Sequence, residues 1–81
     1  MPETKRFISF NYNGVPRIVE CKRDELMKNI CKRFCEKIGG SLDDYIFKYE
    51  NREVNFELSF NNQAKERDKR NCLMYVYVDK K

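Results

Sequence analysis

The chain has 81 residues, of which 41% are hydrophobic and 37% charged, and this composition supports one small hydrophobic core but not two. We therefore expect a single domain over residues 1–81, with an ordered core at about residues 6–78. The net charge is +4, and because the cations are mixed with acids, the charge does not favour a nucleic-acid-binding arm. The sequence has no His, the commonest general base, so we do not expect an enzyme.

Neither a transmembrane segment nor a signal peptide is expected. No apolar run is long enough to cross a bilayer, and residues 1–6 lack the apolar stretch of a secretory signal. We therefore expect an intracellular protein, cytoplasmic or nuclear, with no membrane partner. We also expect it to be a monomer without a small-molecule substrate.

The four Cys are interpreted as reduced thiols, since nothing indicates secretion. Their spacing lacks the paired short loops of a structural zinc site, so we expect no metal and no cofactor. We expect Cys21, Cys31 and Cys72 to pack as small hydrophobic residues, with Cys35 nearer the flank of a helix.

Residues 6–21 are predicted to form a β-hairpin. Its turn is Asn13-Gly14, because both central residues of a type I′ turn need positive φ. A two-residue turn pairs Tyr12 with Val15 and gives the hairpin one core-facing side. The residues on that side are Ile8, Phe10, Val19 and Cys21. Pro16 has no N–H for the ladder, so the second strand should lie at a sheet edge with this position facing solvent.

Residues 24–38 are predicted to form an amphipathic helix with Asp24 as its N-cap. Apolar residues recur at intervals of three and four along one side of it, and these are Met27, Ile30, Cys31, Phe34 and Ile38. Charged residues fill the other side, and Gly39-Gly40 supplies the left-handed conformation that ends a helix.

A capped turn at residues 41–44 leads into a strand at 45–49 and a polar turn at 50–53. Residues 55–64 suit a short extended piece that passes into one helical turn. Residues 65–71 hold no apolar side chain and are predicted to be a solvated loop before a last strand at 72–78.

This order of elements predicts an α+β β-grasp, a mixed sheet with one helix across it and the last strand in its centre. The first and last strands should run parallel, and the second strand should be the edge that tolerates Pro16. The predicted core consists of Ile8, Phe10, Val19, Met27, Ile30, Phe34, Ile38, Phe47, Leu58, Met74 and Val76.

Several pieces of the chain resemble the ubiquitin-like family in order and apolar spacing. They are the Phe7–Cys21 hairpin, the helix start at residues 26–30, the helix end at 37–40, the strand at 45–47, the turn at 58–60 and the strand at 74–78. The resemblance implies a single ubiquitin-like domain that binds another protein and is part of a larger intracellular protein. Its usual contact surface is the solvent face of the third and last strands, which here holds Ile46, Lys48, Tyr75 and Tyr77.

Three other functions stay open from the sequence. A precursor of a conjugated modifier is one, although the sequence after Val78 is Asp79-Lys80-Lys81 and the Gly-Gly pair lies at a helix end. A Ras-binding-type module of the same fold would add a partner strand to the second-strand edge, with Arg17, Lys22, Arg23 and Lys32 as the candidate cations. Nucleic-acid binding is disfavoured, because basic residues do not interleave with stacking aromatics. Asp43-Asp44 is better interpreted as turn chemistry than as a catalytic carboxylate pair.

Overall fold

The structure is a computed structural model that describes residues 5–81. Residues 1–4, which the sequence analysis placed within the single domain, lie outside the described residues. The elements in chain order are β1 (Arg6–Tyr12), β2 (Val15–Cys21), α1 (Met27–Ile38), a 3₁₀ turn (Leu42–Asp44), β3 (Tyr45–Tyr49), β4 (Arg52–Glu53), α2 (Phe60–Gln63), α3 (Glu66–Asn71) and β5 (Leu73–Lys80).

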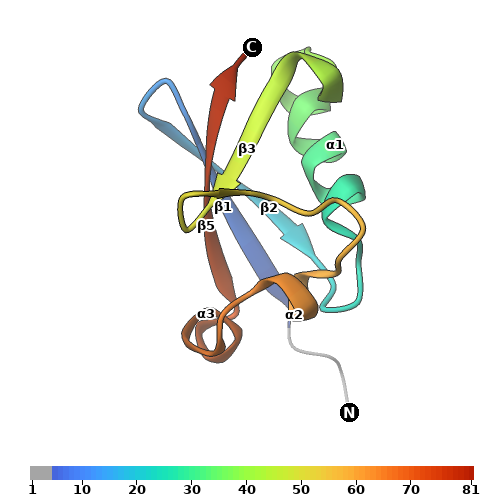
Figure 1. The fold of residues 1–81 in the computed structure, drawn as a ribbon, viewed down its shortest axis with the longest axis vertical. Coiled ribbons are helices and arrows are strands. Elements are labelled where there is room, and N and C mark those ends of the chain that lie inside the picture. Colours follow the sequence, from blue (N-terminus) through green and yellow to red (C-terminus); the bar gives the residue numbers. More distant parts are fainter. Residues whose placement is uncertain (1–4) are drawn as a thin grey trace.

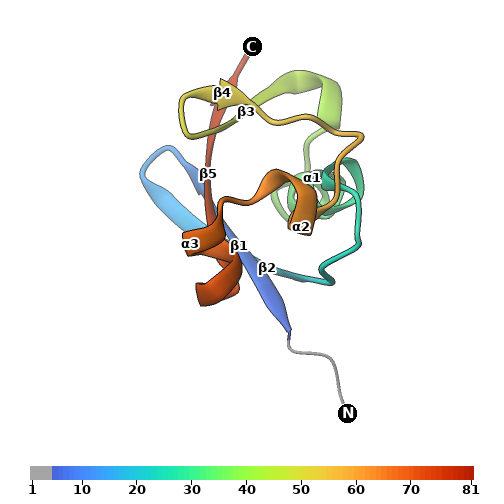
Figure 2. The same ribbon diagram turned by 60° about the horizontal axis from the view of Figure 1, so that its bottom comes forward.

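The strands form one mixed sheet in the order β2-β1-β5-β3-β4. Strand β5 lies in the centre, parallel to β1 and antiparallel to β3. Helix α1 crosses one face of this sheet, while α2 and α3 lie at the end where β5 begins (Figure 1). Seen nearly end-on in Figure 2, α1 covers one side of the sheet. This arrangement confirms the predicted α+β β-grasp.

The hairpin has the predicted register, with Tyr12 opposite Val15 and Ile8 opposite Val19. Asn13 and Gly14 have φ of 55° and 76°, as a type I′ turn requires. Strand β2 is an edge strand, and Pro16 is exposed on it. The Asn13-Gly14 turn therefore predicted the register of β1 with β2 correctly, and the missing N–H of Pro16 predicted the edge position of β2 correctly.

The core lies between α1 and the sheet, and Phe34 of α1 is fully buried at its centre. The Phe34 ring stacks on Phe10 of β1 with centroids 4.6 Å apart, and it meets Phe47 of β3 edge-on at 6.0 Å. Two predicted core residues, Ile38 and Leu58, are only half-buried. Ile38 is the last residue of α1, beside the exposed Gly39, and in the segment that holds Leu58 the fully buried side chain is that of Phe60.

Helix α1 begins at Met27, and its N-cap residue is Leu26, two residues after the predicted N-cap Asp24. Leu26 keeps an extended backbone because it forms a β-bridge with Ser59, and the Met27 N–H donates to the Leu58 carbonyl at 2.8 Å. A tertiary backbone contact thus overrides the local capping signal of an Asp. The predicted helix end is confirmed, with Gly39 at φ 76°.

Residues 65–71 were predicted to be a loop, and this prediction is wrong because Glu66–Asn71 forms helix α3. The Asp68 side chain of this helix is buried, and because it is charged, the spacing of apolar residues could not predict its burial. Cys72 caps α3 at φ 56°, so β5 starts at Leu73 instead of Cys72 and continues to Lys80. The Lys81 N–H, directly after this strand, donates to the Asp44 carbonyl at 2.9 Å.

Candidate protein-interaction face

The four residues predicted to form a binding surface lie on β3 and β5, on the sheet face opposite α1. Met74, Val76 and Val78 are buried against the helix, so the alternation of β5 turns Tyr75 and Tyr77 outward. These two tyrosines are 58% and 61% exposed. On β3, Lys48 is exposed and Ile46 is half-buried.

The strand register brings Lys48 directly opposite Tyr77, and it brings Ile46 opposite Asp79. Lys48 also lies opposite Glu53 of β4, so the aromatic side chain and the acid flank the cation. Lys48 and Tyr77 are therefore direct neighbours, whereas Ile46 and Tyr75 lie on either side of this pair along the strands, and the binding role of all four stays a prediction.

Ile18 belongs to the same surface, although it was not among the predicted binding residues. Ser9 of β1 is the partner of both Ile18 on β2 and Tyr75 on β5, so the three side chains form one row across the sheet. Ser9 is only 8% exposed, whereas Ile18 is 61% exposed. Ile18, Tyr75 and Tyr77, which we call the tyrosine patch, are thus three large exposed side chains, one on β2 and two on β5, with β1 between the two strands. The alternation of β2 from Val19 could have identified Ile18.

Two surface pockets adjoin the tyrosine patch near the β3–β4 turn. The first, of about 280 Å³, is lined by Tyr75 and Tyr77 together with the turn residues Glu50 and Asn51. The second, of about 480 Å³, lies between the turn and the α2–α3 segment, and Glu50 lines it as well. The turn is itself strongly bent, with Glu50 and Asn51 at φ of 52° and 67°.

A buried polar network fixes this turn to α3. The Tyr49 hydroxyl donates a hydrogen bond to Asp68 and accepts one from the Lys65 N–H at 2.9 Å. Arg67 links this network to the turn, because its Nε donates to Asp68 at 3.3 Å and its Nη2 donates to Glu50 at 2.8 Å. Burial, together with the bond to Asp68, raises the pKa of Tyr49 to about 12. The network holds the pocket walls in one geometry.

The pKa of Tyr49 predicts an alkaline loss of stability. An unperturbed tyrosine titrates near 10, so between pH 10 and 12 the folded state retains a proton that the unfolded state has lost, and stability falls as pH rises. At pH 11 we expect Tyr49 to contribute a loss of about 1 kcal/mol relative to pH 9. Urea denaturation of Tyr49→Phe should show a shallower loss over this range than the parent, and equal slopes would contradict the prediction.

The cations of α1 lie on the other side of the molecule, and one of them is already engaged. Arg33 bonds the Glu25 carboxylate and donates to the Glu20 carbonyl at 2.6 Å, which ties α1 to the end of β2. The hydrogen bond from Arg33 lowers the pKa of Glu25. Lys28 and Lys32 are exposed, so Arg33 serves the fold while these lysines remain accessible.

The cysteines do not form a reactive or metal-binding group in the described chain. Cys21, Cys31 and Cys35 are buried, which corrects the predicted flank position of Cys35, and Cys72 is partly buried. Burial raises the pKa of the Cys21 thiol to about 12. Within residues 5–81 no cluster of three or more Cys, Asp or Glu could hold a metal ion, and none of the helices could span a membrane.

Comparison with known proteins identifies the fold. No protein-family model and no curated protein matches the chain. Among solved structures, the ubiquitin of Caldiarchaeum subterraneum superposes with a TM-score of 0.76 at 10% identity, covering 96% of this chain and 95% of its own. The fold is ubiquitin-like. A de novo designed protein based on ubiquitin matches with a TM-score of 0.68 at 14% identity, covering 95% of this chain and 89% of its own.

Identities this low show a shared ubiquitin-like fold and nothing about a shared surface. The function must therefore be argued from the side chains of this chain. Its distinctive surface features are the tyrosine patch and the two pockets beside it.

Proposed function

We infer that this ubiquitin-like domain is a non-enzymatic protein–protein interaction module of a larger intracellular protein, and that it binds its partner through the outer face of β3 and β5. The exposure of Tyr75 and Tyr77 carries this proposal. Tyrosine brings a large contact area, a polar tip and few rotatable bonds, and it is enriched among residues that dominate binding energy. Ile18 and Lys48 extend the surface on either side.

The position of the tyrosines on β5 strengthens the proposal. This strand is central and pairs with β1 on one side and β3 on the other, so the backbone that carries both rings is fixed before a partner arrives. A preorganised aromatic surface loses little conformational entropy on binding. Large exposed apolar side chains grouped on one face of a sheet are also typical of interaction sites.

A binding role also agrees with the side-chain chemistry of the chain. The sequence contains no His, and the buried Cys21, Cys31 and Cys35 thiols all have raised pKa values, which disfavours a thiolate nucleophile. The Gly39-Gly40 pair ends α1 and is a structural feature of the helix. It therefore offers no support for a modifier tail.

Edge addition at β2 is the second candidate, of the kind used by Ras-binding modules. It is favoured by one observation, that β2 forms an edge of the sheet formed by the described residues. Its candidate cations are Lys22, Arg23 and Lys32, all exposed, and Arg17, which is half-buried. A partner strand would pair with the β2 backbone, with acidic side chains facing these cations.

Tyr77→Ala separates the two candidates. We expect it to weaken partner binding by about 1–3 kcal/mol, because a central aromatic anchor is lost from the interface. The partner would first be captured from lysate on the immobilised domain, identified by mass spectrometry and then titrated calorimetrically against folded variants. Arg17→Glu is the matched comparison, and it should bind like the parent.

The opposite pattern would decide for the β2 edge. If Arg17→Glu abolishes binding while Tyr77→Ala binds normally, the partner uses the edge and the sheet-face proposal is wrong. If both variants bind like the parent, neither surface is the site. Circular dichroism of each variant checks that a loss of binding does not come from unfolding.

A further inference from the structure

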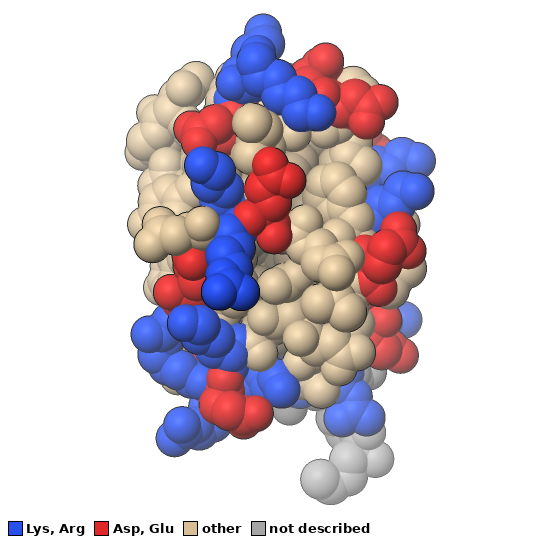
Figure 3. Space-filling model, viewed as in Figure 1, with Lys and Arg blue, Asp and Glu red and all other residues tan. Residues whose placement is uncertain are grey.

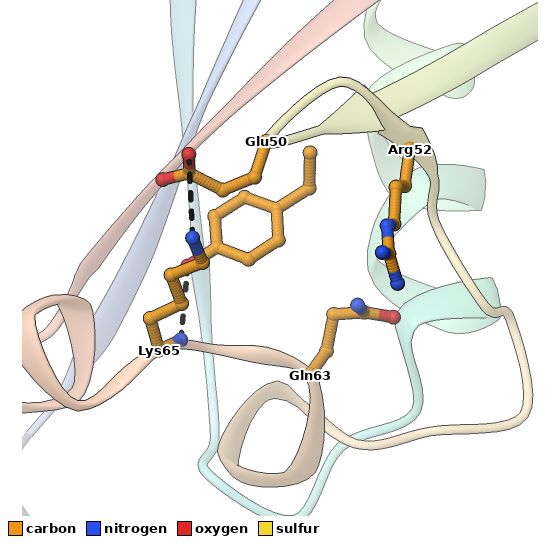
Figure 4. A pocket seen from close by; sticks show the side chains of 5 residues that line it. Glu50, Arg52, Gln63 and Lys65 are labelled. Carbon is orange, nitrogen blue, oxygen red and sulfur yellow. Dashed lines mark hydrogen bonds and ion pairs between the residues drawn. The ribbon is translucent and has the colours of Figure 1, made fainter.

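The larger pocket beside the tyrosine patch presents a cation that the described protein leaves uncompensated. It has a volume of about 480 Å³ and is lined by Tyr49, Glu50, Arg52, Gln63 and Lys65. Figure 4 shows the Arg52 guanidinium extending from the strand end toward the Gln63 carboxamide of α2, while Lys65 faces Glu50 on the other side. Two strand-turn residues and two residues of the α2–α3 segment therefore supply its polar walls.

Three of the polar residues that line the pocket already have partners. The Glu50 carboxylate pairs with Arg67 at 2.8 Å and with Lys65 at 3.7 Å, so Lys65 has an anionic partner. The Gln63 carbonyl oxygen accepts the Asn55 N–H at 2.9 Å, which orients the side chain and leaves its NH₂ group as a donor.

Arg52 differs from these neighbours. Its side chain is exposed and makes no hydrogen bond or ion pair within residues 5–81. The charged residues that line the pocket are Arg52, Lys65 and Glu50, which leaves one positive charge over. A guanidinium offers two parallel N–H groups that match a planar anion, and the Gln63 amide of α2 can add a third donor from the facing side of the pocket.

We propose that this pocket binds a carboxylate, supplied by an Asp or Glu side chain of the protein partner that covers the tyrosine patch. The Arg52 guanidinium pairs with the carboxylate, and the Gln63 NH₂ group donates to it. The protein source of the carboxylate rests on the proposed function, whereas the anion site itself rests on the pocket.

The charge of the pocket selects a carboxylate over a phosphate. A phosphorylated side chain carries a charge of about −1.5 to −2, which exceeds the single positive charge that the lining residues leave over. A carboxylate carries a single charge, which Arg52 alone compensates. Figure 3 shows Lys and Arg side chains gathered on the side where α3 lies, with fewer acidic side chains among them.

The pocket and the tyrosine patch can contact one partner segment. Glu50 lines both this pocket and the smaller one formed by Asn51, Tyr75 and Tyr77. A segment that packs an apolar side chain on the tyrosines can therefore continue past Glu50 and place an acidic side chain at Arg52. The preferred partner is thus a peptide segment with an acidic residue close to an apolar one.

An NMR titration of the ¹⁵N-labelled protein tests the site directly. The probe is the peptide acetyl-Leu-Glu-Leu-amide, with acetyl-Leu-Gln-Leu-amide as its uncharged control and inorganic phosphate as a separate titrant. We expect the Glu peptide to shift the Arg52 Nε–H and Gln63 NH₂ signals with millimolar affinity and at least fivefold more tightly than the Gln peptide. Phosphate should bind more weakly than the Glu peptide.

Variants then assign the effect to the guanidinium. Arg52→Gln should reduce binding of the Glu peptide to the level of the Gln peptide, and Arg52→Lys should retain part of it. Lys28→Gln removes one exposed positive charge from α1 and should leave binding unchanged, which controls for net charge. Unchanged binding in Arg52→Gln, equal binding of the two peptides, or tighter binding of phosphate would each overturn the inference.

The captured partner distinguishes failure of this inference from failure of the proposed function. Loss of the partner in Tyr77→Ala but not in Arg52→Gln would support the sheet-face interface and reject the carboxylate contact. Loss in Arg52→Gln but not in Tyr77→Ala would support the carboxylate contact and reject the tyrosine patch.

Discussion

Replacing Phe34 by Ala is expected to cost about 3–5 kcal/mol of folding stability, because the substitution removes a fully buried ring and leaves a cavity. Phe34 is in contact with the rings of Phe10 on β1 and Phe47 on β3, so the substitution removes packing against both strands. Small domains have only about 5–15 kcal/mol in total, and this one change removes a large share of that. Urea denaturation followed by circular dichroism measures it.

Phe56→Ala is the matched control, since the same ring is deleted from a half-buried site. Phe56 contacts Phe47 edge-on at 6.0 Å but lies at the margin of the core, so its loss should cost clearly less than that of Phe34. Equal costs for the two variants would show that the packing between α1 and the sheet does not dominate stability.

The hairpin and helix α1 were predictable from sequence because their signals are local. Positive φ at Asn13 and Gly14 fixes a two-residue turn, and that turn fixes the register of every pair in the hairpin. The stripe of apolar residues in α1 points to the core by helical periodicity alone, and Gly39 ends it. Pro16 then excludes a central position for β2.

Helix α3 and the start of α1 were not predictable in the same way. Residues 65–71 have no apolar face, and they are helical here with Asp68 turned inward to a hydroxyl from a distant strand. Leu26 similarly takes its conformation from Ser59, which lies far along the chain. Such contacts leave no periodic pattern, because one polar side chain or one β-bridge decides the local structure.

The residues of the candidate site also differ in whether the sequence predicts their position. Strand alternation was enough to turn Tyr75 and Tyr77 outward, and the same rule applied to β2 would have added Ile18. The Arg52–Gln63 pocket depends instead on how α2 docks beside the β3–β4 turn, which no spacing in the sequence encodes. Binding surfaces on strands are thus easier to predict from sequence than pockets between irregular segments.

Asp68→Ala is expected to cost about 2–3 kcal/mol, since it removes a charged hydrogen-bond acceptor from the buried Tyr49 hydroxyl. The Asp68 side chain is only 4% exposed, so water cannot replace the carboxylate without opening the structure. Loss of this bond also weakens the link between α3 and the β3–β4 turn, which then depends on the contacts of Glu50 with Arg67 and Lys65 and on the Lys65 N–H bond to Tyr49. Chemical denaturation at pH 7 gives the cost.

Glu66→Ala is the matched control on the same helix. Its side chain is 81% exposed and pairs only with Lys69 at 3.4 Å, so its removal should cost less than about 0.5 kcal/mol. Asp68→Asn retains an acceptor for the Tyr49 hydroxyl and should recover part of the stability lost in Asp68→Ala. If Asp68→Ala is as stable as Glu66→Ala, the network does not hold α3, and the walls of the Arg52 pocket are not fixed by it.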